Sequence, residues 1–87
     1  MARIHLPATL PAIFPGLPRQ VDVDAATVRD ALDRLDERWP GLRDRLCEPG
    51  PVLRRHINVY VDLERADIDR ALVATSRVDL IAAISGG

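Results

Sequence analysis

Residues 24–41, DAATVRDALDRLDERWPG, decide the fold. Their apolar side chains recur at the spacing of one helical face, namely Val28, Leu32, Leu35 and Trp39. Asp24 or Thr27 can cap the first turn, because short polar side chains accept hydrogen bonds from free backbone N–H groups. Pro40-Gly41 ends the segment, since the residue before a proline avoids helical angles. The stretch therefore predicts one amphipathic helix.

The segments on either side of this helix alternate with period two, which is typical of half-buried strands. Before the helix, RIHLPATL and RQVDVD flank a turn-rich loop at residues 11–18 and predict a hairpin. After it, LRDRLCEPGP predicts a short turn, HINVYVD a strand, residues 66–68 a brief edge strand, and RVDLIAAIS a closing strand. The expected inward residues are Ile4, Leu6, Ala8, Leu10, Val21, Val23, Leu42, Leu46, Ile57, Val59, Val61, Leu72, Val78, Leu80, Ala82 and Ile84.

The order of elements is a hairpin, a helix, a strand, a short edge strand and a strand. Strands interrupted by one long helix favour two packed layers, with a mixed sheet wrapped around that helix. This is an α+β arrangement of the β-grasp, or ubiquitin-like, type. The 87 residues suffice for a single core, so we expect one domain over residues 1–87.

The composition argues against several classes of protein. The formal net charge is -1, which gives little attraction to nucleic acid, and acidic residues within 27–46 oppose DNA binding by a helix-turn-helix. Cys47 is the single cysteine, so neither an internal disulfide nor a multi-cysteine zinc site is expected, and we predict no metal site. The N-terminus lacks the pattern of a signal peptide, and no segment is a membrane span. A cytoplasmic protein without membrane contact is the expectation.

Three segments resemble the MoaD/ThiS sulfur carriers. TVRDALDRLDERWPGLRDRL resembles their helix and the turn after it, HINVYVD their central strand, and VDLIAAISGG their closing strand and diglycine tail. IHLPATL and HINVYV are similar to the CysO-type branch, which feeds sulfide into cysteine biosynthesis. Family members commonly have a Gly-rich turn with an Asp before the last strand and two prolines before the tail. Here residues 74–77 are ATSR and residues 82–83 are two alanines.

The resemblance implies that the chain is a carrier and not an enzyme. It implies that a ThiF/MoeB-like activating enzyme uses ATP to adenylate the carboxylate of Gly87, and that sulfur then displaces AMP to leave a thiocarboxylate. The tail, residues 85–87, is expected to be flexible, and Gly86 lets it thread into a narrow channel because glycine has no Cβ. A cysteine synthase-like enzyme would accept the sulfur. The carrier itself binds no cofactor.

The resemblance leaves other functions open. The client enzyme of the same chemistry is alternatively the large subunit of molybdopterin synthase or an enzyme of the thiamine pathway. A ubiquitin-like adaptor, which binds through its sheet and makes no use of its tail, is the rival from a different class. For docking we expect Ile81 on the outer sheet surface with Tyr60 as a possible neighbour, and Ile84 and Ser85 as further contacts.

Several other residues favour a plain structural interpretation. His5 and His56 lie on the polar sides of predicted strands and are expected to be inert surface imidazoles. Cys47 follows a core-facing leucine, so a structural thiol is favoured over a sulfur relay. On the helix, Arg34 is placed to pair with Asp30, as residues four apart do on a solvated face. Terminal glycines taken alone are more typical of a frayed end or a cloning remnant than of a functional tail.

Overall fold

The computed structural model describes residues 1–82, and residues 83–87 lie outside the described part. The sheet strands are β1 (Ala2–His5), β2 (Gln20–Val23), β5 (Ile57–Val61), β6 (Glu64–Ala66) and β7 (Arg77–Ala82). The remaining elements are the 3-10 helix η1 (Leu10–Ala12), helices α1 (Val28–Arg38) and α2 (Leu42–Leu46), and a small hairpin of β3 (Cys47–Glu48) and β4 (Val52–Leu53). The sheet strands and the main helix follow the order expected from the sequence, whereas η1, α2 and the β3–β4 hairpin stand where a loop and a short turn were expected.

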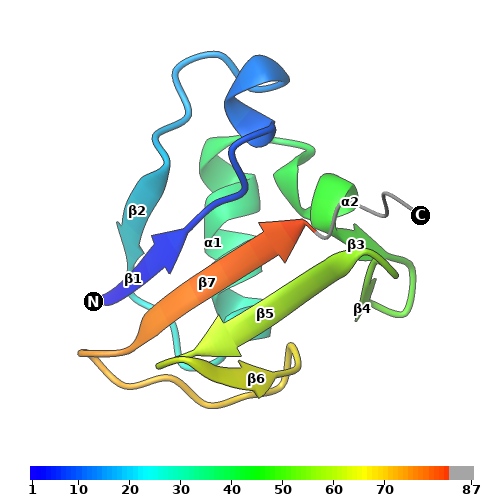
Figure 1. The fold of residues 1–87 in the computed structure, drawn as a ribbon. Helices are drawn as coiled ribbons and strands as arrows, with labels where there is room; N and C mark the ends of the chain where they lie inside the picture. The colour runs from blue at the N-terminus through cyan, green and yellow to red at the C-terminus, as the bar shows by residue number, and fades with distance from the viewer. Residues whose placement is uncertain (83–87) are drawn as a thin grey trace.

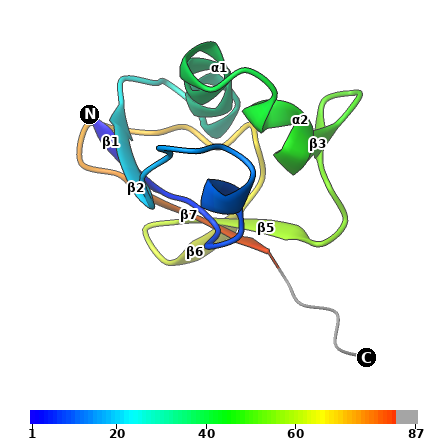
Figure 2. The same cartoon turned by 90° about the horizontal axis from the view of Figure 1, so that it is seen from above.

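The five sheet strands lie in the order β2-β1-β7-β5-β6. β1 and β7 run parallel, and every other neighbouring pair is antiparallel, so the sheet is mixed. Helices α1 and α2 lie on one side of the sheet (Figures 1 and 2). A mixed sheet packed against one main helix is the β-grasp arrangement, and the predicted fold class is confirmed.

Helix α1 covers the segment in which apolar residues recur at helical spacing. The Thr27 hydroxyl accepts a hydrogen bond from the Asp30 N–H at 3.1 Å, so Thr27 and not Asp24 is the N-cap. Val28, Leu32 and Leu35 face the sheet and are buried. Trp39 closes the helix as its C-cap and packs only partly against the core. The core is aliphatic as predicted, and its largest fully buried side chains are Ile4, Leu32, Leu35, Leu42, Leu46, Val28, Val59, Val61 and Val78.

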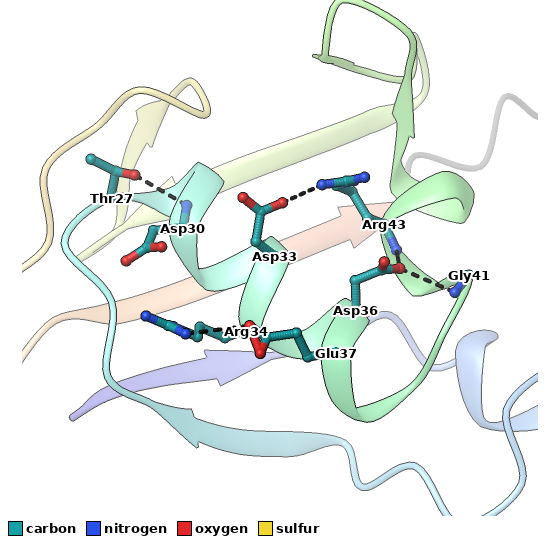
Figure 3. Close-up of polar contacts among 8 residues, drawn as sticks. All are labelled: Thr27, Asp30, Asp33, Arg34, Asp36, Glu37, Gly41 and Arg43. Carbon is teal, nitrogen blue, oxygen red and sulfur yellow. Dashed lines mark hydrogen bonds and ion pairs between the residues drawn. The ribbon is translucent and has the colours of Figure 1, made fainter.

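A carboxylate joins α1 to α2 (Figure 3). Asp36 accepts hydrogen bonds from the backbone N–H groups of Gly41, at 3.1 Å, and of Arg43, at 3.0 Å. Gly41 has a φ of +94°, which favours glycine, so the chain reverses there and presents the free N–H groups of α2 to Asp36. Arg43 also pairs with Asp33, whose hydrogen bond and charge raise the pKa of the guanidinium.

The expected pairing of Arg34 with Asp30 is wrong. Arg34 pairs with Glu37, one turn further along the helix, at 3.3 Å. The Asp30 carboxylate instead accepts the Ala26 N–H at 3.1 Å, alongside the cap made by Thr27. Asp30 is in the first turn of α1, where free N–H groups attract a negative charge. The Asp30 carboxylate therefore pairs with the N-terminal end of the helix and not with the solvent-exposed Arg34.

The first strand is shorter than its alternation predicts. β1 ends at His5, and the exposed Ala8 is not an inward strand residue. Leu10 does reach the core, but from η1. Pro7 has no N–H to continue a ladder, so the chain turns away after Leu6. The alternating pattern here combined a strand with a turn of 3-10 helix.

The edge strand was predicted too late in the chain. β6 spans Glu64–Ala66, and Ile68 is buried outside any strand. Asp62 and Leu63 both have positive φ, 51° and 71°, so a tight turn directly after β5 starts the return strand at once. The sequence predicts a plain turn where the β3–β4 hairpin lies, because Pro49, Gly50 and Pro51 separate two strands of only two residues each. Leu72 is buried, as expected.

Candidate functional site

The end of β7 is the natural place to look for function, because residues 83–87 of the sequence follow it directly. β7 lies in the middle of the sheet, between β1 and β5. Val78 and Leu80 are buried in the core, and Ala82 is still in register with Ile57. β7 pairs with β1 as far as Asp79 and with β5 as far as Ala82, so strand pairing and two buried side chains fix where the described chain ends. The predicted site residues Ile84, Ser85, Gly86 and Gly87 lie outside the described residues.

Ile81 lies on the outer face of the sheet, on the side away from α1. Its side chain is 48% exposed, whereas Leu80 before it is buried. In register it stands opposite Asn58, and Tyr60 stands opposite Asp79. Tyr60 is therefore a diagonal neighbour of Ile81 on the same face, within reach of a long side chain. The sequence placed both residues on the outer face correctly, and their role in docking stays a prediction.

Charged residues next to Tyr60 are paired with each other. Arg77 donates to both carboxylate oxygens of Asp79, at 3.0 and 3.2 Å. The Asp79 side chain is only 14% exposed, because His5 of β1 and Tyr60 of β5 flank it in register. At the far edge, Arg65 of β6 donates to the Asn58 amide oxygen at 2.9 Å. These contacts make the outer face a largely preformed polar surface.

A groove of about 430 Å³ borders the end of β7. One wall consists of residues 5–9, which leave β1, and the other of residues 79–82; Arg19 and Arg77 also line it. The sequence did not indicate this groove, since it arises from the parallel pairing of β1 and β7, segments more than 70 residues apart. A second groove of the same volume lies between residues 51–55 and β6, on the other side of β5.

The two groups most often involved in proton or sulfur chemistry are not arranged for catalysis. Cys47 is buried, and desolvation raises the pKa of its thiol, so it lacks the thiolate character of a sulfur relay. His56 is exposed, but Nε2 of His5 is buried without a hydrogen-bond partner among the described residues. The expectation of an inert surface imidazole is therefore wrong for the environment of His5.

Within residues 1–82, no three side chains of histidine, cysteine, aspartate or glutamate come together to hold a metal ion. None of the helices in this part of the chain has the length and apolar character needed to cross a membrane.

Comparison with known proteins gives consistent results. Residues 12–87 match the model of the ThiS family. Small archaeal modifier protein 1 of Haloferax volcanii is 41% identical over 69 residues, which are 78% of this chain and 79% of that protein. Its crystal structure superposes with a TM-score of 0.77 at 36% identity, over 99% of this chain and 98% of the other. A chain of the Amycolatopsis orientalis BexX/CysO complex superposes with a TM-score of 0.88 at 25% identity, over the whole of both chains.

Proposed function

The chain belongs to the ThiS family, and from this premise we propose that it is a sulfur carrier whose C-terminal carboxylate, on Gly87, becomes a thiocarboxylate. Family and fold make it a ubiquitin-like modifier or sulfur carrier of the ThiS/MoaD type. The observation that carries the proposal is the central strand β7, buried at Leu80, which leads within five residues to a Gly-Gly sequence. The folded part of the chain is thus followed by two residues without side chains and a terminal carboxylate.

The proposed chemistry has two steps. In the first, a carboxylate oxygen of Gly87 attacks the α-phosphorus of ATP within a ThiF/MoeB-like activating enzyme, and pyrophosphate leaves. In the second, sulfide attacks the acyl carbon, and AMP leaves to give the thiocarboxylate. The activating enzyme must exclude water from the acyl adenylate. ATP is thus a substrate of the partner, and the carrier supplies a positioned group without a cofactor of its own.

The basic residues of the chain do not react readily with an activated acyl group. All 12 are arginines, and a guanidinium stays protonated at physiological pH, so it is a poor nucleophile. No lysine side chain of one copy can therefore attack the adenylate of another. The absence of lysine supports a role in which the chain donates the acyl or sulfur group at its C-terminus and does not accept an acyl group on a side chain.

We favour a cysteine synthase-like enzyme of the cytoplasm as the sulfur acceptor. The resemblance of IHLPATL and HINVYV to the CysO-type branch supports this choice, as does the similarity to a chain of the BexX/CysO complex. The large subunit of molybdopterin synthase and the thiamine pathway are the alternative acceptors. Incubating the thiocarboxylate form with each candidate acceptor and its substrate, and assaying sulfide transfer, distinguishes them.

Protein modification is a second candidate function, favoured by the 41% identity to small archaeal modifier protein 1. In that case an amine of another protein, instead of sulfide, attacks the acyl carbon. Arg77 is the last trypsin site, so a modified lysine would retain residues 78–87 as a tryptic remnant. Mass spectrometry of the host proteome for this remnant tests the candidate directly.

Intact-mass analysis of the chain purified from its own host tests the proposed function. Replacing one terminal oxygen by sulfur adds about 16 Da, and the same spectrum shows whether Gly87 is the native terminus. Deleting Gly87 should abolish sulfur transfer while the fold survives, because residues 1–82 hold the whole described core. A deletion that leaves the biology intact would instead support the adaptor function.

A further inference from the structure

On the strands of the outer face, the three arginines Arg3, Arg65 and Arg77 outnumber the two carboxylates Asp22 and Asp79, although the whole chain carries -1. Both carboxylates that point outward from β2 and β7 are already occupied: Asp22 by Arg3 at 3.5 Å and Asp79 by Arg77 at 3.0 Å. Arg65 contacts an amide only, so it adds a charge that no carboxylate in the described part of the chain neutralises. The acidic residues Asp33, Asp36 and Glu37 lie on the helical side of the molecule.

The groove beside the end of β7 contains further unused hydrogen-bonding capacity. Arg19 donates through Nε to the Leu6 carbonyl at 3.3 Å, which holds the side chain in place. Its two terminal nitrogens form no ion pair with residues 1–82. Thr9, which lines the same groove, adds a hydroxyl. A guanidinium that is fixed at Nε and open at its two ends is preorganised for a bidentate carboxylate.

The imidazole of His5 lines the same groove and lacks one hydrogen-bond partner. Its Nε2 is buried and lacks a hydrogen-bond partner among the described residues. A buried polar atom without a partner is costly, and such atoms are rare unless a ligand, water or ion completes them. The ring lies next to Asp79 in register, but that carboxylate is already held by Arg77. With its hydrogen on Nε2, the ring can donate to an acceptor in the groove once a side-chain rotation turns this nitrogen toward the groove.

We propose that this groove receives an acidic side chain, Asp or Glu, of the activating enzyme, held by Arg19 and His5. The proposal rests on the proposed function and specifies the chemistry of the partner surface. Ile81 and Ala82 line the groove too, so a carboxylate bound there touches the strand that leads to the tail. An acidic partner also suits the excess positive charge of this face, since complementary potentials steer and orient docking.

The test measures binding of the ThiF/MoeB-like enzyme from the same organism to the full chain by titration calorimetry. Arg19→Gln should weaken the Kd about tenfold or more, because it leaves a partner carboxylate without its guanidinium. Arg45→Gln is the matched control: it removes an equal charge from an exposed position on α2, where the side chain forms no ion pair with residues 1–82. Its Kd should stay within twofold, and the salt dependence of Kd should fall for Arg19→Gln only.

His5→Phe separates docking from a structural role. Removing a nitrogen without a partner should leave the Tm unchanged or raise it, while the Kd weakens at least threefold. Equal effects of Arg19→Gln and Arg45→Gln, or normal binding by His5→Phe, would overturn the proposal. A shift in the His5 ring NMR signals on deletion of Gly86 and Gly87, without enzyme, would also overturn it, because the chain's own terminus would then occupy the groove.

The outcomes also separate this proposal from the proposed function. A thiocarboxylate detected by intact mass, combined with unchanged binding by Arg19→Gln, rejects only the acidic contact. If the unmodified chain does not bind the activating enzyme at all and its native mass shows no sulfur, both proposals fail.

Discussion

Replacing Ile81 by alanine tests whether the outer face at the end of β7 is a docking surface. Fully burying an isoleucine side chain is worth about 1.5–3 kcal/mol, and 48% of this one is exposed. A partner that covers the exposed part gains about 1 kcal/mol from it. Ile81→Ala should therefore weaken binding of the activating enzyme about fivefold, since 1.4 kcal/mol corresponds to a factor of ten.

The same change should affect folding only modestly. The part of Ile81 that packs on the sheet contributes about 1 kcal/mol, so the free energy of unfolding should fall by no more than that. Calorimetric titration gives the Kd, and urea unfolding gives the stability. Val73→Ala is the control, because Val73 is also exposed, at 64%, but lies in the turn before the other end of β7. Binding within twofold of the unchanged chain, or an equal loss in Val73→Ala, would refute the reasoning.

The remaining predictions concern the stability and reactivity of the fold. Asp36→Ala should lower the free energy of unfolding, measured in urea, by about 2 kcal/mol, because two backbone N–H groups at the start of α2 lose their charged acceptor. The control Glu37→Ala, which removes only an exposed ion pair, should change it by less than about 0.5 kcal/mol. Leu35→Ala should lower the free energy of unfolding by about 2–5 kcal/mol, since the side chain is 0% exposed and its removal leaves a cavity. A nearly unchanged Tm in a circular-dichroism melt would contradict this packing. Burial raises the pKa of the Cys47 thiol, so the native chain should react with iodoacetamide more slowly at pH 8 than the chain in urea. The unfolded thiol then loses its proton first, so stability should fall as the pH rises from the ordinary thiol value of 9.0 toward the raised pKa of the folded chain, and Cys47→Ala should remove that slope.

The sequence by itself determined the elements with a clear period. The spacing of Val28, Leu32 and Leu35 predicted a helical face, and the alternation of Ile57, Val59 and Val61 with polar residues predicted a strand buried on one side. The outward position of Ile81 followed from the same rule. Residue spacing sets these properties locally, so they could be read without knowledge of the fold.

Tertiary structure decided what depends on contacts between distant segments. The groove at the end of β7 exists because β1 lies parallel to it, and nothing local to Arg19 or His5 shows that they meet there. Asp30 does not pair with the expected arginine, because its carboxylate accepts the Ala26 N–H just before the helix instead. Non-local pairing brings residues together that are remote in sequence, and competition among polar partners is settled only by the distances that the folded chain creates.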